Sequence, residues 1–282
     1  MLIELDNVTH VYQDENNVKA LKNINLEISR GEFIGIVGHT GSGKSTLVQL
    51  FNGLIIPSSG SVKVNGKNIT NEKSNLKETR RHVGLVFQYP EHQLFEESVY
   101  QDIAFGPKNI GLKKDEIEDR VKEVMGLVGL DYNQFKDRSP FNLSGGQQRK
   151  VAIAGVLALK PDVLVLDEPS AGLDPQGRKQ LAELLQYLYQ ELNMTIILIS
   201  HRMEEIAELS SRVIVMHQGE IVIDDNPIEV FSKEQKLHKL SLDLPQITEI
   251  LHRLDEKGLK VNKNLFSISE ASTEIIKALR SN

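Results

Sequence analysis

The chain has 282 residues, 40% hydrophobic and 26% charged, so it can bury one large core or a large and a small one. It has no cysteine, which excludes disulfides, thiolate catalysis and cysteine metal sites. The net charge of −6 argues against non-specific nucleic-acid binding, and we expect no nucleic-acid partner. No apolar run approaches the roughly 20 residues that cross a bilayer, so any membrane contact should run through a partner protein.

Two strands are predicted ahead of the first motif. Residues 2–12 and 21–28 alternate apolar and polar side chains with a period of two. Tyr12, near the end of the first strand, is a candidate for stacking on an adenine ring. Packing at the rim of the fold is the alternative, and it is the more common role of an aromatic residue at a strand end.

The dominant motif lies between an apolar strand at residues 33–37 and a helix that starts near Leu47. It consists of Gly38, His39, Thr40, Gly41, Ser42, Gly43, Lys44, Ser45 and Thr46. In this pattern, glycines let consecutive backbone N–H groups turn toward phosphate oxygens at the positive end of a helix. Lys44 should reach the β- and γ-phosphates, and Ser45 should give its hydroxyl to Mg²⁺. The sequence therefore predicts a phosphate loop.

The next segment predicts a hairpin with an Asn-Gly turn within residues 61–69, then a strand at residues 81–88 that ends on Gln88. From residue 90 to about 160 the pattern changes. Prolines interrupt it, and residues 114–128 carry apolar side chains on a helical period. We expect a mostly helical insertion between strands of the sheet.

A second anion-binding turn is predicted inside this insertion. It consists of Leu143, Ser144, Gly145, Gly146 and Gln147, directly before a helical run at residues 148–160. The alternative is a structural turn in which the Ser144 hydroxyl only caps the helix.

Two later apolar strands end in polar side chains. Residues 161–168 end in Asp167 and Glu168, and His201 follows the strand at residues 195–200. Ligands of open α/β sheets bind beyond the carboxyl ends of the strands, so these side chains should lie beside the phosphate loop. Asp167 suits a Mg²⁺-bound water, and Glu168 suits a base for the attacking water. A structural role is the alternative for His201.

The last predicted elements are a hairpin at residues 211–224 and a tail beyond Pro227. The tail has two helical stripes of apolar residues, at 247–254 and at 275–279. It is too short to fold alone, so its apolar faces should pack on the main domain or on a partner chain.

Taken together, these motifs resemble those of ABC-type ATPase subunits over residues 2 to about 232. The resemblance implies an α/β fold, a P-loop NTPase of ABC type, with a parallel-sheet core, an antiparallel β subdomain and a helical subdomain at about 90–160. A nucleotide-binding domain at residues 1–232 would be followed by a small C-terminal extension at 233–282 that contacts the other subunit of a dimer. ATP and Mg²⁺ are the implied cofactors.

The same resemblance implies a role for each motif. Two chains would sit head to tail, with two ATPs between the phosphate loop of one chain and the Ser-Gly-Gly turn of the other. The implied contacts are Lys44 and Ser45 with phosphates and Mg²⁺, Gln88 with Mg²⁺, Glu168 as general base, His201 with the γ-phosphate, and Tyr12 with adenine. Ser144 and Gly146, in the turn completed by Gly145 and Gln147, would hold the γ-phosphate of the opposite ATP, and Asp174 would lie at the dimer interface.

A finer resemblance lies in residues 87–99 and 102–107, which are similar to ATPases of energy-coupling factor (ECF) transporters. These are prokaryotic importers of vitamins and of nickel or cobalt. The resemblance implies that a transmembrane coupling subunit docks near Pro90 to Glu97 and that separate membrane subunits capture the substrate. Residues 38–41 and 139–141 look more like the second, A-prime, of two paralogous ATPases, so the dimer would be a heterodimer with that paralogue or a homodimer.

The sequence therefore predicts an ATPase coupled to transport, peripheral to the cytoplasmic face of the cell membrane. One alternative is the nucleotide-binding subunit of an ordinary ABC transporter. Another is an ABC-type ATPase that acts on DNA or the ribosome, against which the single phosphate loop, the lack of a heptad array and the negative charge argue. A binding module without turnover would be expected to lack Glu168 or His201.

Overall fold

The computed structural model describes residues 1–13, 17–70 and 76–281. A six-stranded sheet with the order β10-β9-β3-β8-β7-β6 runs through its centre. Its strands are β3 (Phe33–Val37), β6 (Val83–Val86), β7 (Val163–Asp167), β8 (Thr195–Ile199), β9 (Arg212–His217) and β10 (Glu220–Asp225). Only the β9–β10 pair is antiparallel among these neighbours, so the carboxyl ends of the other strands meet at one edge.

The inner strands of this sheet are buried on both faces. In β7, Leu164 and Leu166 point into a core shared with helices, whereas Val163 and Val165 point into a core shared with a second sheet. All five residues of β7 and of β8 are buried. The continuous apolar runs in the sequence follow from this double burial.

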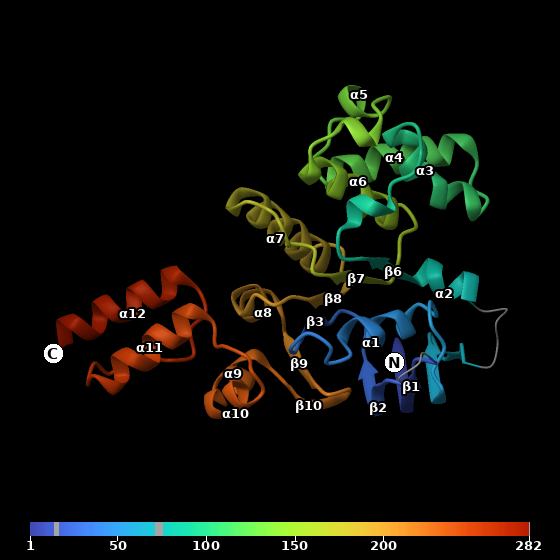
Figure 1. The fold of residues 1–282 in the computed structure, drawn as a ribbon. Helices are drawn as coiled ribbons and strands as arrows, with labels where there is room; N and C mark the ends of the chain where they lie inside the picture. Colours follow the sequence, from blue (N-terminus) through green and yellow to red (C-terminus); the bar gives the residue numbers. More distant parts are fainter. Residues whose placement is uncertain (14–16, 71–75, 282) are drawn as a thin grey trace.

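The second sheet is antiparallel, with the order β2-β1-β4-β5. It contains β1 (Ile3–Val11), β2 (Lys19–Ile28), β4 (Ser59–Val64) and β5 (Lys67–Asn68). Helix α1 (Lys44–Phe51) lies between the two sheets, where Leu47, Leu50 and Phe51 are buried (Figure 1). The predicted Asn-Gly turn is confirmed, since Asn65 and Gly66 join β4 to β5 with φ values of 50° and 74°.

The predicted insertion is helical and lies at the top of Figure 1. It contains η2 (Pro90–Gln93), α3 (Val99–Asn109), α4 (Lys114–Leu127), α5 (Tyr132–Phe135), η3 (Pro140–Asn142) and α6 (Gly145–Leu157). Helices α7 (Pro175–Gln190) and α8 (Met203–Leu209) lie beside the main sheet. The predicted strand at 81–88 is too long at both ends, because Arg81 and His82 belong to α2 (Leu76–His82) and β6 ends at Val86.

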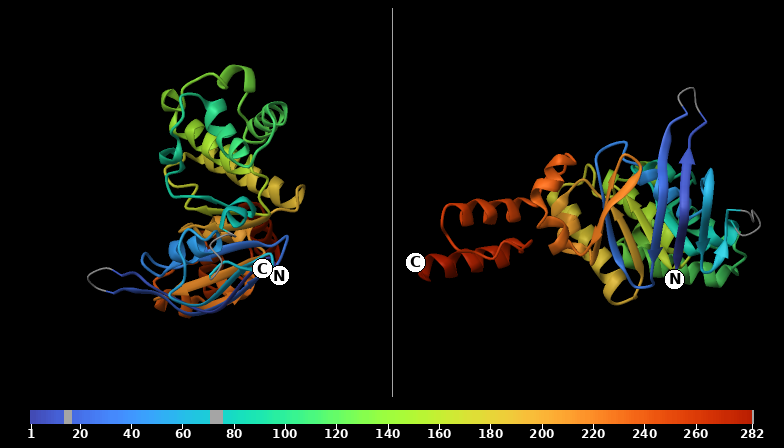
Figure 2. Two further views of the ribbon diagram at one scale, coloured as in Figure 1. Left: turned by 90° about the vertical axis from the view of Figure 1, so that its right-hand side faces the viewer. Right: turned by 90° about the horizontal axis from the view of Figure 1, so that it is seen from below.

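The tail begins in the body of the molecule and then leaves it. After α9 (Pro227–Phe231) and α10 (Glu234–Lys239), Leu242 and Leu244 are still part of the main core. Helices α11 (Gln246–Glu256) and α12 (Ile268–Ser281) then form a hairpin that projects from one side (Figures 1 and 2). Among the described residues, no helix combines the length and the hydropathy that a membrane span requires.

Candidate active site

One cavity of about 580 Å³ at the carboxyl edge of the main sheet gathers most of the predicted site. Its lining includes Tyr12, Thr40, Gly41, Gly43, Lys44, Ser45, Thr46, Gln88, Asp167, Glu168 and His201. Gly38, His39 and Ser42 complete the phosphate loop without lining the cavity. The volume falls within the roughly 300–1,000 Å³ that is usual for small-molecule sites.

The phosphate loop depends on its glycines. Gly43 has a φ of +103°, and a Cβ there would lie 2.6 Å from the carbonyl oxygen of Ala20. At Gly38, a Cβ would lie 2.3 Å from the carbonyl oxygen of Met216. Larger residues at either position would displace the loop from the body of the protein.

At the centre of the loop, the Lys44 ammonium donates hydrogen bonds to the carbonyl oxygens of Gly38 at 2.6 Å and His39 at 3.1 Å. Burial lowers the pKa of Lys44, while the nearby Glu168 and Asp167 carboxylates oppose that shift. Among the residues that the structure describes, the buried Ser42 hydroxyl has no hydrogen-bond partner. A buried cation at the first residue of α1, in a glycine-rich loop, fits a phosphate group.

Glu168 and His201 contact each other in the cavity. The Glu168 amide donates to the carbonyl oxygen of Ile199 at 3.0 Å, which joins the ends of β7 and β8. The Glu168 carboxylate then lies 3.2 Å from Nε2 of His201. Burial raises the pKa of Glu168 to about 7, although a hydrogen bond from the His201 backbone opposes the shift. A carboxylate with a pKa near neutrality is well matched to general-base catalysis.

The three predicted magnesium ligands meet in the same cavity. Ser45, Gln88 and Asp167 offer a hydroxyl, an amide oxygen and a carboxylate, and hard cations such as Mg²⁺ prefer oxygen ligands. Burial raises the pKa of Asp167, and the nearby Ser45 hydroxyl opposes that rise, so these two side chains lie close together. The residues present therefore fit a Mg²⁺ ion beside bound phosphates.

Tyr12 lies at the rim of the cavity, with 38% of its surface exposed. Its hydroxyl is 3.2 Å from Oγ1 of Thr46, at the start of α1. The ring of His10 packs edge-on against it, with the centroids 4.8 Å apart. The structure thus brings Tyr12 to the phosphate loop, and stacking on adenine stays a prediction.

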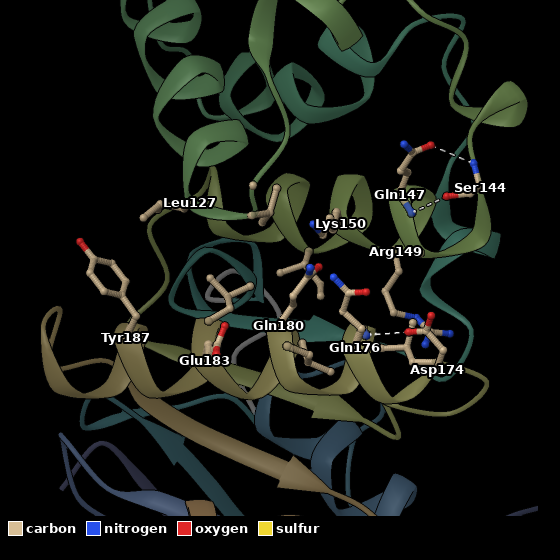
Figure 3. Close-up of a pocket in the computed structure, with 18 of the residues that line it drawn as sticks. Leu127, Ser144, Gln147, Arg149, Lys150, Asp174, Gln176, Gln180, Glu183 and Tyr187 are labelled. Atoms are coloured by element: carbon tan, nitrogen blue, oxygen red, sulfur yellow. Dashed lines mark hydrogen bonds between the residues drawn. The ribbon is translucent and has the colours of Figure 1, made fainter.

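The Ser-Gly-Gly turn does not join this cavity. Ser144, Gly146, Gln147 and Asp174 line a separate cleft of about 950 Å³ between α6 and α7 (Figure 3). Ser144 caps α6, since its hydroxyl accepts from the Gln147 amide and the Gln147 side chain accepts from the Ser144 amide. Gly145 begins the helix. A single chain therefore keeps the two predicted phosphate-binding turns apart.

Sequence reasoning missed several lining residues: Val18, Lys19, Ala20, Lys22, Gln218 and Gly219. They enter the site because the β9–β10 turn lies against β2, where the Lys22 amide donates to the carbonyl oxygen of Gly219 at 2.8 Å. The contact joins segments almost 200 residues apart, and the alternating pattern of β2 carries no sign of it. The two lysines add positive charge at the mouth of the cavity.

Comparison with known proteins places this geometry in a family. Residues 21–171 match the ABC transporter family. The chain is 51% identical to the energy-coupling factor transporter ATP-binding protein EcfA2 of Clostridium tetani, over 98% of this chain and 97% of that protein. The chain belongs to the ABC transporter family. EcfA2 of Streptococcus pyogenes is 45% identical, over 98% of this chain and 99% of that protein.

Solved structures agree with this assignment. CbiO1 of Clostridium perfringens, described as part of the ABC transporter complex cbiONQ, superposes with a TM-score of 0.75 at 40% identity, covering 89% of this chain and 98% of that one. A dimeric bacterial ABC transporter cassette superposes with a TM-score of 0.73 at 29% identity, covering 80% of this chain and 99% of that one. These findings confirm the predicted fold and the resemblance to the second ECF ATPase. As a member of this family, the chain is an ATPase coupled to transport.

Proposed function

We propose that this chain binds ATP and Mg²⁺ in the cavity at the carboxyl edge of the sheet, hydrolyses the ATP, and thereby powers an ECF-type importer of vitamins or transition-metal ions. The observation that carries the proposal is the meeting of the phosphate loop with Glu168 and His201 in one cavity. The protein would work at the cytoplasmic face of the cell membrane as a peripheral subunit.

Within the cavity, Lys44 and the loop amides bind the β- and γ-phosphates, and Tyr12 stacks on the base. Ser45, Gln88 and Asp167 would hold Mg²⁺, and the ion would supply positive charge against the phosphates. Glu168 accepts a proton from the attacking water, and His201 hydrogen-bonds the γ-phosphate. The rest of the catalysis is positioning and electrostatics.

A second ATPase chain completes each site. Ser144 and Gly146 lie in a cleft apart from the phosphate loop, so they act on a nucleotide held by another subunit. Asp174 lines the same cleft and would contact that subunit. We assign the partner as the paralogous ATPase, with a second copy of this chain as the alternative. Binding of two ATPs closes the pair, and loss of the γ-phosphate lets it open.

A transmembrane subunit docks beside η2, near Pro90 to Glu97. A cavity of about 620 Å³ lies there, lined by Leu94, Phe95 and Phe105, and the rings of Phe95 and Phe105 pack edge-on with their centroids 4.8 Å apart. Phe95 is 57% exposed, although the amides of Phe95 and Glu96 are fixed by hydrogen bonds to the Asp102 carboxylate. An ordered, exposed aromatic beside a groove suits a partner helix.

The test is affinity purification of the tagged chain from detergent-solubilised native membranes, followed by mass spectrometry. We expect a paralogous ATPase, one integral coupling protein and several small membrane proteins that capture substrates. Phe95→Glu should lose the membrane proteins and keep the ATPase. The matched control, Leu192→Glu at another exposed apolar residue, should keep both. Recovery of a fixed permease pair, or of no membrane protein, would overturn the ECF proposal.

A further inference from the structure

One half-buried carboxylate outside the cavity joins the two loops that carry the catalytic pair. Glu205 lies in the first turn of α8 with 17% of its side chain exposed. Its Oε2 accepts hydrogen bonds from the hydroxyls of Ser170 at 2.8 Å and Ser200 at 3.0 Å. Its Oε1 lies 3.0 Å from Nε of Arg202.

The two serines are placed next to the catalytic residues. Ser170 follows Glu168 by two positions, and Ser200 directly precedes His201. Both serines are buried, with exposed fractions of 5% and 0%. Hydrogen bonds to an ionised acceptor are stronger than those between neutral groups, and here water has little access to compete. Glu205 therefore fixes the chain beside each catalytic residue.

The loop after β7 needs such support. Glu168 has a φ of +52°, a left-handed conformation that a residue with a side chain adopts only when its surroundings hold it there. The Glu205 carboxylate holds this loop from behind, through Ser170, while the His201 loop is held through Ser200. The same oxygen thus sets the distance between the two loops.

Helix α8 itself packs closely against the main sheet. It packs against Gly35 of β3 so closely that a Cβ at that position would lie 2.6 Å from both Cγ2 of Ile206 and Oγ of Ser210. Ile206 is fully buried in the main core. Glu205 therefore extends from a rigid support, which suits a group that has to define a geometry.

We propose that Glu205 is a positioning residue for ATP hydrolysis: through Ser170 and Ser200 it holds Glu168 and His201 in the arrangement in which their side chains contact each other in the cavity. The inference rests on the roles proposed above for Glu168 and His201. Glu205 does not line the cavity, so it affects the reaction step and leaves nucleotide binding to other residues.

The test compares Glu205→Ala and Glu205→Gln in the assembled transporter ATPase, with kcat, KM and ATP affinity measured separately. Misplacement of a catalytic group by about 1 Å can cost roughly 10²-fold in rate, so kcat of Glu205→Ala should fall about 10- to 100-fold. KM and ATP affinity should change less than about threefold. Glu205→Gln keeps an oxygen that accepts from the serines, so it should recover most of the lost rate.

Two further variants separate positioning from general destabilisation. The double variant Ser170→Ala/Ser200→Ala should lower kcat as much as Glu205→Ala does. The triple variant, which adds Glu205→Ala, should have almost the same kcat as the double variant, because all three side chains act through the same hydrogen bonds. This double variant also carries the test if Glu205→Ala does not fold. Glu208→Ala, one turn further along α8 and exposed, is the matched control and should keep the normal rate.

Normal kcat in Glu205→Ala or in the serine double variant overturns the inference, as does a parallel loss of ATP affinity. Failure of Glu205→Gln to restore the rate also overturns it. Glu168→Gln, measured beside these variants, distinguishes an error in the proposed general base from an error in the positioning role of Glu205. If Glu168→Gln remains active, the proposed base is wrong; if it is inactive while Glu205→Ala is normal, only the positioning role is wrong.

Discussion

At the scale of single residues, burial changes the pKa values of the charged groups in the site. Glu168 combines a left-handed backbone with a pKa raised to about 7 by burial, and it touches His201. A carboxylate with this pKa binds a proton more strongly than an exposed one, which makes it a better base for water. The same burial lowers the pKa of Lys44 only in part, because two carboxylates lie nearby.

Replacing Glu168 by Gln should therefore stop hydrolysis without stopping binding. The amide keeps the size of the side chain and cannot accept the proton, so turnover should fall by about 10²–10⁴. Phosphate release and equilibrium ATP binding measure the two effects separately. Glu118→Gln on α4, where the carboxylate pairs with Lys122 at 2.7 Å, serves as the control and should keep full turnover. Near-normal turnover in Glu168→Gln would remove this residue from the role of base.

Much of the site could be predicted because its residues stand in short local patterns. The spacing of Gly38, Gly43 and Lys44 already implies a loop around phosphate, and Glu168 ends an apolar strand. Glu205 had no such signal. It lies among several glutamates on one short helix, and its partners Ser170 and Ser200 are ordinary residues whose meeting depends on the fold.

At the scale of elements, Asp162 joins four segments. It lies just before β7, and its carboxylate accepts hydrogen bonds from Arg30 before β3, Asn65 in the β4–β5 turn and His82 at the end of α2. Burial pushes the pKa of Asp162 up, but these hydrogen bonds outweigh it and hold the pKa below its usual range. The cluster attaches the antiparallel sheet and α2 to the main sheet.

This lowered pKa predicts a pH-dependent stability. Because the folded-state pKa lies below the unfolded value of about 3.9, the stabilisation is present above that value and is lost as pH falls through the folded pKa. Asp162→Asn should lower the free energy of unfolding by about 1–2 kcal/mol at pH 7, less than for a fully buried pair because Arg30 is largely exposed.

Urea denaturation at pH 7 and at successively lower pH checks this expectation. The difference between the wild type and Asp162→Asn should shrink below about pH 4. Asp243→Asn, at an exposed carboxylate in the tail, is the control and should show almost no difference at any pH. A difference that stays constant as the pH falls would contradict the assigned cause.

Sequence patterns predicted two kinds of element well: those that contact residues nearby in the chain, and strands that are buried on both faces. Strands β7 and β8 appear as unbroken apolar runs because two cores enclose them. Strand β6 was predicted two residues too early because His82 ends α2 with its ring on Asp162, 80 positions away. A hydrophobicity pattern within ten residues cannot indicate a contact with a residue 80 positions away.

At the scale of the whole molecule, the α11–α12 hairpin leaves apolar surface uncovered. Ile268, Ile276 and Leu279 are 71%, 50% and 62% exposed, whereas Leu242 and Leu244 just before the hairpin are buried in the main core. A pair of amphipathic helices that projects from the body with its apolar residues open suits contact with a second subunit. The periodicity of the tail predicted its helices, and only the fold shows that they leave the body.

Ending the chain after Leu244 should therefore weaken association and spare the fold. Without residues 245–282, affinity for the partner ATPase should fall at least about tenfold, which corresponds to 1.4 kcal/mol. The thermal midpoint of the isolated chain should fall only modestly, because the buried residues of the main core remain and the main loss there is the packing of Phe266 on Phe231. Sedimentation of the mixed subunits and thermal unfolding measure the two quantities.

A pair of point variants sharpens the same prediction. Ile276→Ser/Leu279→Ser should reproduce the loss of affinity, and Glu256→Ser, at an exposed polar position of α11, should not. Undiminished association of the shortened chain would show that α11 and α12 do not hold the subunits together.

The separation of Lys44 from Ser144 into two cavities has a consequence for inheritance. Under the roles proposed above for a pair of different subunits, Lys44 would serve the ATP on its own chain and Ser144 the ATP on the other, so two mutations in one gene would disable two different nucleotide sites. Each composite site is then encoded by halves of two genes. A change that alters one gene touches both sites, and the two sequences have to evolve together.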